Sequence, residues 1–399
     1  MRLIKKIYSK CITFFTLSFL YPFIYKIYSR KTVNSKKVLF LVMRKSELTN
    51  NFSLLYNTLD NETDFNLKCH YLLSESCSKP EYIKRCINYV KDLSTAKYVF
   101  LDEATHITAK IDIRADTFIT QLWHGCGAFK KFGYSTSLSS FGATKKTMNR
   151  FPPNKNYSLV TVSCEEVIPH FEEAMGYEKK GTVKATGISR TDVFFDKGFI
   201  EKSYENLYKL FPAAKNKKVI LYAPTFRGNV ENATTPNLLD IKMLCKKLSD
   251  EYVIVIKHHQ IVKNLPPVPG GLSDTFAIDL TEKMDINELL CVSDICISDY
   301  SSLVFEYSLF ERPMIFFAYD LDEYFDSRGF YYDYDELTPG PVFSTTEEIA
   351  DYILNIDSHY DKNTVINFRN KFMSSCDGKA TQRIIDEVFG EIYEKHLRK

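Results

Sequence analysis

The stretch CVSDICISDYSSLVFEY, from Cys291 to Tyr307, decides the fold because it predicts a buried strand that turns sharply into a helix. The apolar run 295–297 is typical of a strand that is buried on both faces. The turn follows at Asp299, and Ser301 and Ser302 occupy the first helical turn, where backbone N–H groups lack helical partners. An anion placed there meets these N–H donors, two hydroxyls and the positive end of the helix dipole. A plain helix cap explains the same residues equally well, so the rest of the chain must decide.

The bulk composition indicates a globular protein of more than one domain. A chain of 399 residues is longer than one ordinary domain. Its ten cysteines are spread along the chain without a CxxC pair, which indicates reduced, mostly buried thiols of a cytoplasmic protein. The sequence contains no HExxH spacing and no Walker or GxGxxG loop. Any phosphate chemistry must therefore rest on helix N-termini, Arg, Lys and His, with a metal only optional.

The N-terminal segment differs from the rest in charge. The first 46 residues carry eleven Lys and Arg and no acidic residue, which leaves −9 for the remainder because the total is +2. The run CITFFTLSFLYPFIY at 11–25 is uncharged, but its 15 residues fall short of the roughly 20 of a spanning helix, and no small-residue cleavage site follows. We expect residues 1–35 to lie on an anionic membrane surface as a peripheral anchor. A short inserted anchor and a buried N-terminal helix are the alternatives.

Short apolar runs alternate with stretches of helical length along the rest of the chain, in two sets. The first set of expected strands is Lys36–Arg44, Leu67–Leu73, Ala96–Glu103, Asp116–Trp123, Ser158–Cys164 and Thr182–Gly187. The second set is Lys217–Thr225, Glu251–His259, Ser293–Asp299 and Arg312–Asp320. Such alternation predicts parallel sheets with covering helices. We therefore expect two doubly wound, Rossmann-like α/β domains that face one another across a cleft, with ligands beyond the carboxyl ends of the strands.

The two sets also predict the domain boundaries. The α/β domains are expected at 36–200 and 201–365, after the membrane-associating segment. Helices at 366–399 are expected to pack back toward the N-terminal domain.

His124 is the first candidate for chemistry. It lies in QLWHGCGAFKKFG, directly after an expected strand, between a strand end and two lysines. Gly125 and Gly127 let the backbone approach a ligand closely. A lone histidine is more often a structural hydrogen-bonding group, but this position favours a functional one.

Basic residues end several other expected strands. Side chains alternate in VIKHHQ, so Lys257 and His259 are expected to share one face, suited to a phosphate oxygen, while His258 packs against the sheet. Arg227 in YAPTFRGN can offer a bidentate fork to phosphate, and Arg190 in TGISRTD is a comparable candidate. Either arginine is equally compatible with a solvated loop.

The segment 320–342, after the last expected strand, mixes acidic with aromatic residues, which suggests a lid or an acceptor-facing surface.

Together these motifs resemble the CDP-glycerol glycerophosphotransferase family of teichoic-acid and capsule polymerases. The resemblance runs from about Lys36 to the C-terminus and rests on WHG with trailing lysines, YAPTFR, a strand ending in basic-x-His, SDYSSLVFEY, RGFYYDY with TPGP, and DGKAT. It implies a GT-B-like fold at the cytoplasmic membrane face. It also implies transfer of glycerol phosphate from CDP-glycerol to a hydroxyl of a lipid-linked polymer acceptor, with release of CMP.

Other functions fit the same motifs. Ribitol-phosphate or other CDP-alditol transferases look alike here, and a GT-B glycosyltransferase that uses a nucleotide-sugar is a second alternative. A catalytically silent scaffold that binds anionic lipid or polymer is a third. None of these functions involves a nucleic-acid partner, and none requires a cofactor.

The resemblance implies roles for individual residues. The domain at 36–200 would be the acceptor side and that at 201–365 the nucleotide-donor side. His124 would be the general base on the acceptor hydroxyl, and Glu306 would bond the cytidine ribose. The donor diphosphate would be held by Arg227, Lys257, His259, Ser301 and Ser302, with Arg190 nearby and with Gly125 and Asp299 supporting the loops.

Two departures from the family pattern matter. The usual WHGTPLK-like sequence is here WHGCGAFKKFG, with Cys126 and Gly127 in place of a Thr-Pro pair. Lys257 stands where the family has an arginine, and the next residue is another histidine, which leaves open whether His258 or His259 is functional. Side-chain alternation and motif spacing both favour His259.

Overall fold

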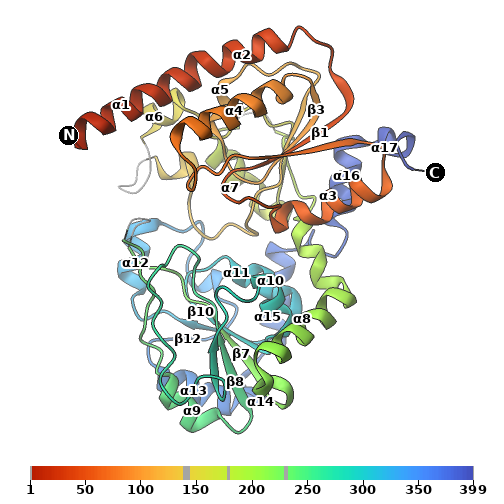
Figure 1. Ribbon diagram of the computed structural model, residues 1–399. Helices are drawn as coiled ribbons and strands as arrows, with labels where there is room; N and C mark the ends of the chain where they lie inside the picture. Colours follow the sequence, from red (N-terminus) through yellow and green to blue (C-terminus); the bar gives the residue numbers. More distant parts are fainter. Residues whose placement is uncertain (1, 138–143, 178–179, 229–231, 399) are drawn as a thin grey trace. The chain divides into compact units, whose positions relative to one another are not determined.

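The computed structural model describes residues 2–137, 144–177, 180–228 and 232–398, and this part of the chain folds into two compact units (Figure 1). The first unit comprises Met1–His124, Phe132–Arg190 and Lys379–Lys399, and the second comprises Gly125–Lys131 and Thr191–Gly378. Each unit contains one six-stranded, fully parallel sheet. The α/β class predicted from the alternation is therefore correct.

The first unit is built on the strand order β2-β1-β3-β4-β5-β6. Its strands are β1 (Asn34–Val42), β2 (Asn66–Tyr71), β3 (Ala96–Leu101), β4 (Phe118–Gln121), β5 (Leu159–Thr161) and β6 (Val183–Lys184). Its helices are α1 (Arg2–Phe15), α2 (Tyr21–Tyr28), α3 (Asn50–Glu62), α4 (Lys79–Leu93), α5 (His106–Lys110), α6 (Lys145–Arg150), α7 (Ile168–Met175), α16 (Ala380–Phe389) and α17 (Glu391–Lys395). All six strands of the first predicted set are present.

The second unit follows the order β12-β11-β10-β7-β8-β9. Its strands are β7 (Lys218–Tyr222), β8 (Tyr252–Ile256), β9 (Ala277–Asp279), β10 (Ile295–Ser298), β11 (Met314–Phe317) and β12 (Val342–Phe343). Its helices are α8 (Lys197–Leu210), α9 (Ile241–Leu248), α10 (Ile286–Val292), α11 (Leu303–Tyr307), α12 (Leu321–Arg328), α13 (Thr346–Leu354), α14 (Ile356–His359) and α15 (Lys362–Phe372). The alternation did not predict β9 and β12, and β8 ends three residues before the predicted His259.

Strand order places the loops after β7 and β10 at a topological switch point. The chain leaves β7 for β8 on one side and returns with β10 on the other, so the loops after β7 and β10 diverge from neighbouring strand ends. Ligands of open α/β sheets bind at such points. In the first sheet, the chain likewise switches sides between β1 and β3.

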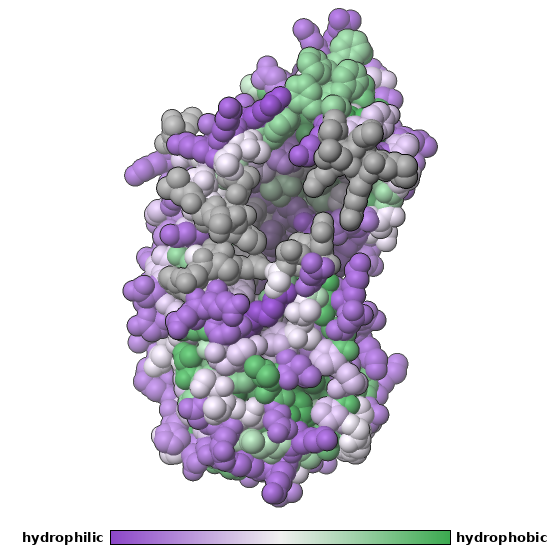
Figure 2. All heavy atoms as spheres, turned by 90° about the vertical axis from the view of Figure 1, so that its left-hand side faces the viewer, coloured by the Kyte–Doolittle hydropathy of each residue, from purple (hydrophilic) through white to green (hydrophobic). Residues whose placement is uncertain are grey.

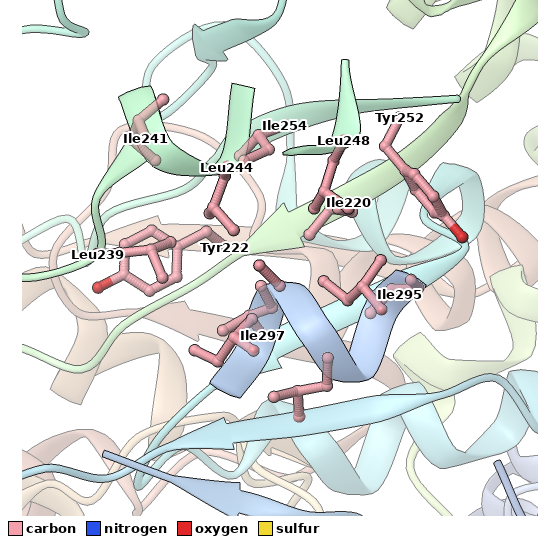
Figure 3. Packing of buried hydrophobic residues seen from close by; sticks show 14 of the residues in the cluster. Ile220, Tyr222, Leu239, Ile241, Leu244, Leu248, Tyr252, Ile254, Ile295 and Ile297 are labelled. Atoms are coloured by element: carbon pink, nitrogen blue, oxygen red, sulfur yellow. The ribbon is translucent and has the colours of Figure 1, made fainter. Parts of the chain in front are cut away.

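The core of the second unit shows why these strands form. Figure 3 shows isoleucines of three central strands that belong to one buried cluster with leucines of α9: Ile220, Ile254, Ile295, Ile297, Leu244 and Leu248, each at most 2% exposed. Burying one such side chain stabilises the folded state by about 1.5–3 kcal/mol of free energy relative to leaving it exposed to water. The rigid sheet formed in this way fixes the loops at its carboxyl edge.

The unit boundaries differ from the expected ones. The loop Gly125–Lys131 belongs to the second unit because it pairs with the segment after α12: Lys131 N donates to Gly329 O at 3.1 Å and Tyr331 N to Phe129 O at 3.2 Å. Residues 366–378 also belong to the second unit. The remaining C-terminal residues belong to the first unit, where four apolar side chains of α16 join the core beside β1 and β3.

The N-terminal helix has one buried and one exposed face. It runs from α1 through a π-helical turn at Thr16–Leu20 into α2, and Pro22 removes one backbone donor next to that turn. Leu17, Tyr21 and Tyr25 are buried in the first unit, where α2 packs on α4. The segment Lys10–Tyr28 is long and apolar enough to cross a membrane, and 22% of it is buried. The alternative of a wholly buried helix does not fit this exposure.

Candidate active site

The loop after β4 begins with a strained residue. Trp123 has a φ of +60°, a left-handed conformation that is rare for a bulky side chain. Its backbone N–H donates to Gln121 Oε1 at 2.9 Å, and its ring stacks on that of His124 with centroids 4.7 Å apart. Such strain costs on the order of 1–3 kcal/mol and is concentrated at functional sites. The strained backbone next to His124 therefore supports a functional role for this loop.

The ring of His124 is oriented by one hydrogen bond. Nδ1 lies 3.1 Å from the backbone oxygen of Asp102, which follows β3. A carbonyl oxygen only accepts, so Nδ1 carries the proton and Nε2 carries the lone pair. The side chain is exposed. This arrangement suits a general base that takes a proton at Nε2.

Two further residues hold this loop. The Asp102 carboxyl group is only 2% exposed and accepts a hydrogen bond from Thr49 Oγ1 at 2.5 Å. This bond connects the end of β3 to the loop before α3. Burial raises the pKa of Asp102, and the hydrogen bonds from Thr49 and Asn51 oppose this rise. Arg190 Nη2 donates to the backbone oxygen of His124 at 3.2 Å. Arg190, predicted as a phosphate ligand, thus contacts the loop of the predicted base.

The turn after β10 is organised by Asp299, which is 2% exposed. Its Oδ1 accepts from the backbone N–H groups of Thr225 and Tyr300 at 2.9 and 2.7 Å. This carboxylate therefore ties the turn to the loop after β7, the support role predicted for it.

The two serines of the turn begin a short helix, α11. Ser302 occupies the N-cap position and is exposed, while Ser301 Oγ accepts from Leu303 N at 3.3 Å. A Cβ placed on Gly125 would lie 3.9 Å from Ser302 Oγ. The structure thus brings the residue after His124 next to the predicted donor-phosphate turn.

Arg227 is not oriented as predicted. Its Nε and Nη2 form a fork with Asp320 at 2.6 and 3.0 Å, and Nη2 also donates to Asp299 Oδ2 at 3.0 Å. Nη1 donates to the backbone oxygen and the hydroxyl of Thr225 at 2.8 and 2.9 Å. All five N–H donors of the guanidinium are therefore directed to protein oxygens. The predicted phosphate fork is wrong for this state, and Arg227 is a positioning residue.

Aromatic rings surround this ion cluster. The guanidinium carbon of Arg227 lies 5.1 Å from the ring centroids of both Tyr300 and Tyr324, which stack on each other at 4.0 Å. Burial disfavours the charge of Arg227, but the bonds and charges of Asp320 and Asp299 outweigh it and raise its pKa. Lys130 Nζ, from the loop after His124, donates to the Tyr324 hydroxyl at 2.7 Å. Of the aromatic residues in the segment 320–342, Tyr324, Phe330 and Tyr334 are buried within the second unit.

The three residues that follow β8, Lys257, His258 and His259, have different surroundings. His258 is 4% exposed and its Nδ1 lies 2.9 Å from Thr235 Oγ1, which confirms the prediction that it packs. Lys257 Nζ donates at 2.6 Å to the backbone oxygens of Thr281 and Met284, so its ammonium stabilises a loop instead of extending toward a ligand. His259 is exposed beside the ring of Phe226. His259 remains the predicted ligand of a donor phosphate.

His258 makes stability depend on pH. Burial lowers its pKa and Asp279 opposes this shift, so folding favours the neutral ring. Below the ordinary pKa of about 6.5, the unfolded chain binds a proton that the folded chain resists, and stability falls as pH falls. We expect the cost of His258→Gln to shrink between pH 7.5 and pH 5, by up to about 1.4 kcal/mol per pH unit below 6.5. Urea unfolding of both proteins at several pH values measures this difference, and a constant difference would contradict it.

The family assignment follows from a comparison with known proteins. The model of the family described as CDP-Glycerol:Poly(glycerophosphate) glycerophosphotransferase matches residues 23–390. The chain belongs to this family. It is thus an enzyme of the CDP-alditol phosphotransferase type, as its motifs predicted.

Family members with curated names give more detail. The chain is 36% identical over 375 residues to the teichoic acid poly(ribitol-phosphate) polymerase of Bacillus spizizenii, an overlap of 92% of this chain but only 58% of that protein. It is 32% identical over 364 residues to the teichoic acid ribitol-phosphate primase of the same organism, 89% of this chain and 91% of that one. Matched proteins named as glycerol-phosphate polymerases or primases are 26–29% identical.

A solved structure confirms the GT-B type of fold. The structure of the wall teichoic acid polymerase TagF superposes with a TM-score of 0.76 at 23% identity and covers 93% of each chain.

The contact of Glu306 with the cytidine ribose, which the family resemblance implies, stays a prediction. Glu306 lies in α11 and is 2% exposed. Among the described residues, no group of three or more His, Cys, Asp or Glu side chains is arranged to hold a metal ion. Trp123, Asp102 and Asp320 were not among the predicted site residues.

Proposed function

We propose that this protein transfers ribitol phosphate from CDP-ribitol to a hydroxyl group of a teichoic acid acceptor and releases CMP. The sequence analysis favoured glycerol phosphate, with ribitol phosphate as an alternative. The relatives named as ribitol-phosphate enzymes are more similar to this chain than those named as glycerol-phosphate enzymes, which supports the alternative. The observation that carries the transfer chemistry is the hydrogen bond from His124 Nδ1 to Asp102 O.

The proposed reaction is an in-line phosphoryl transfer. Nε2 of His124 takes the proton of the acceptor hydroxyl, whose oxygen forms a bond to the phosphorus that carries the polyol. The bond from this phosphorus to the oxygen that bridges to CMP breaks, and CMP leaves with that oxygen. Such a transfer depends on positioning and charge stabilisation. The hydroxyls of Ser301 and Ser302, the N–H groups at the start of α11 and His259 are the proposed donor-phosphate ligands.

A donor comparison tests the proposed substrate. We expect CMP release from CDP-ribitol, in the presence of a ribitol-phosphate acceptor, with a kcat/KM at least tenfold above that for CDP-glycerol. Preference for CDP-glycerol would reinstate the glycerol assignment. Turnover of a nucleotide-sugar alone would support the glycosyltransferase alternative, and turnover of no donor would support a scaffold.

The N-terminal helix is proposed to hold the enzyme on the cytoplasmic face of the membrane. Phe15, Phe19 and Phe23 follow each other at intervals of four residues and are 56%, 56% and 63% exposed. An apolar patch with hydrophilic neighbours is visible at the level of this helix in the upper part of Figure 2. Aromatic side chains on one face and basic residues around them are typical of a helix that lies in the bilayer interface.

Replacing these three rings tests the anchor. We expect Phe15→Ser, Phe19→Ser and Phe23→Ser together to lower binding to phosphatidylglycerol vesicles at least tenfold, because the apolar contact is lost. Activity on a short soluble acceptor should remain. Leu354→Ser, at a 54% exposed position of α13, is the matched control and should bind as the parent does. Full flotation of the triple variant with vesicles would rule out this face as the anchor.

A further inference from the structure

A cavity of about 950 Å³ lies within the first unit beside the N-terminal helix. Its volume is within the range of about 300–1,000 Å³ that is usual for small-molecule sites. Apolar side chains from the helix, from α6 and from the segment after α6 line it: Phe14, Leu17, Met148, Phe151 and Pro153. Leu17 and Met148 are 7% and 5% exposed and so form buried parts of this lining. Such a lining favours a hydrocarbon group.

The two charged side chains that line this cavity, Lys10 and Arg150, are both basic. Lys10, His106 and Arg150 contribute to its lining, and none of the described residues that line it is acidic. Lys10 and Arg150 are exposed. The guanidinium carbon of Arg150 lies 5.1 Å from the ring centroid of Phe14, so this cation is adjacent to the apolar lining. An amphiphile with a negative headgroup matches this distribution of charge.

The cavity is also continuous with the exposed face of the N-terminal helix. Phe14 lines the cavity, and its ring meets that of Phe19 edge-on with centroids 5.9 Å apart. Phe19 belongs to the aromatic face proposed above to lie on the membrane. An α-helix with its side chains is only about 10–12 Å across, so a lipid of the adjacent leaflet is within reach.

We propose that this cavity binds one molecule of an anionic membrane phospholipid. One hydrocarbon chain packs against Leu17, Met148 and Phe151, and the phosphate lies beside Lys10 and Arg150. This site adds specific recognition of a single lipid to the general attraction of the basic segment to an anionic surface. It does not depend on which CDP-polyol the enzyme uses.

A soluble lipid tests the site without a bilayer. We expect dioctanoyl-phosphatidylglycerol, titrated as monomers into the full chain by calorimetry, to bind at least tenfold more tightly than dioctanoyl-phosphatidylcholine or glycerol 3-phosphate. The first comparison ligand has the chains without net charge, and the second has the charge without the chains. The double variant Lys10→Ala/Arg150→Ala should weaken binding at least tenfold. Met148→Trp, which fills the cavity, should do the same.

Two control variants separate binding in this cavity from a general attraction of the lipid to basic or aromatic surfaces. Lys145→Ala/Lys146→Ala removes the same charge from α6 at exposed positions outside the lining, and Phe23→Ser removes a 63% exposed ring of the outer face that is not part of the lining. Both should bind the soluble lipid within twofold of the parent. Equal affinity for phosphatidylcholine would overturn the proposal, as would an equal loss of affinity in the two double variants. If Met148→Trp does not fold, the comparison of these two double variants decides.

Discussion

His124→Asn is expected to lower kcat for polyol-phosphate transfer by about 10²–10⁴, the usual contribution of a general base. Asn has no basic nitrogen at the position of Nε2, so the acceptor hydroxyl keeps its proton. The KM for the donor should change little because the predicted donor ligands lie on other elements. Steady-state CMP release, together with thermal unfolding to verify the fold, measures both quantities.

His359→Asn is the matched control for this substitution. His359 is an exposed histidine at the end of α14, and its replacement should leave kcat unchanged. Retention of more than a fifth of the parent kcat by His124→Asn would remove His124 from the role of base. A large rise in donor KM at constant kcat would instead indicate a role in binding.

Arg227→Met is expected to give the largest loss of stability in the second unit, about 3–5 kcal/mol. The methionine fills similar space but leaves Asp299 and Asp320 without their cation. The Asp299 side chain is only 3% exposed, and burial already raises its pKa while Arg227 opposes this rise. Asp299 therefore has to bind a proton or remain charged without its partner. Urea unfolding at pH 7 measures the change in free energy.

Two comparisons isolate the ion cluster as the cause. Lys371→Met breaks an ion pair with Glu336 whose side chains are 38% and 48% exposed, and exposed pairs contribute only about 0–1 kcal/mol. Adding Asp320→Asn to Arg227→Met should recover part of the loss, because one unpaired carboxylate is removed. A cost of Arg227→Met below that of Lys371→Met would contradict the positioning role.

The sequence predicted the strands that form the centre of each sheet. Runs such as 219–222 and 252–256 are continuous and apolar because both faces of these strands are covered by helices. The two strands that were missed, β9 and β12, are three and two residues long and lie at the two edges of the second sheet. Such short edge strands are formed by pairing with a neighbour and carry almost no pattern of their own.

The candidate site was predictable only where one local motif contains the whole feature. WHG and SDYSS identified His124 and the turn around Asp299 because each lies directly after a strand. The surroundings of Arg227 could not be predicted in this way, since its carboxylate partners are 72 and 93 residues away in the sequence. A sequence motif shows that an arginine is present, but only the tertiary structure shows which groups occupy its donors. The role of the Asp102 backbone oxygen depends on tertiary contacts in the same way.

The most direct test of polyol-phosphate transfer follows the phosphate itself. CDP-ribitol labelled at the phosphate attached to ribitol is incubated with the full chain and an acceptor, and the nucleotide product is separated from the polymer. The proposed reaction predicts labelled polymer and unlabelled CMP in equal amounts. Labelled CDP with unlabelled polymer would mean that the bond to the ribitol carbon breaks, and would contradict phosphoryl transfer.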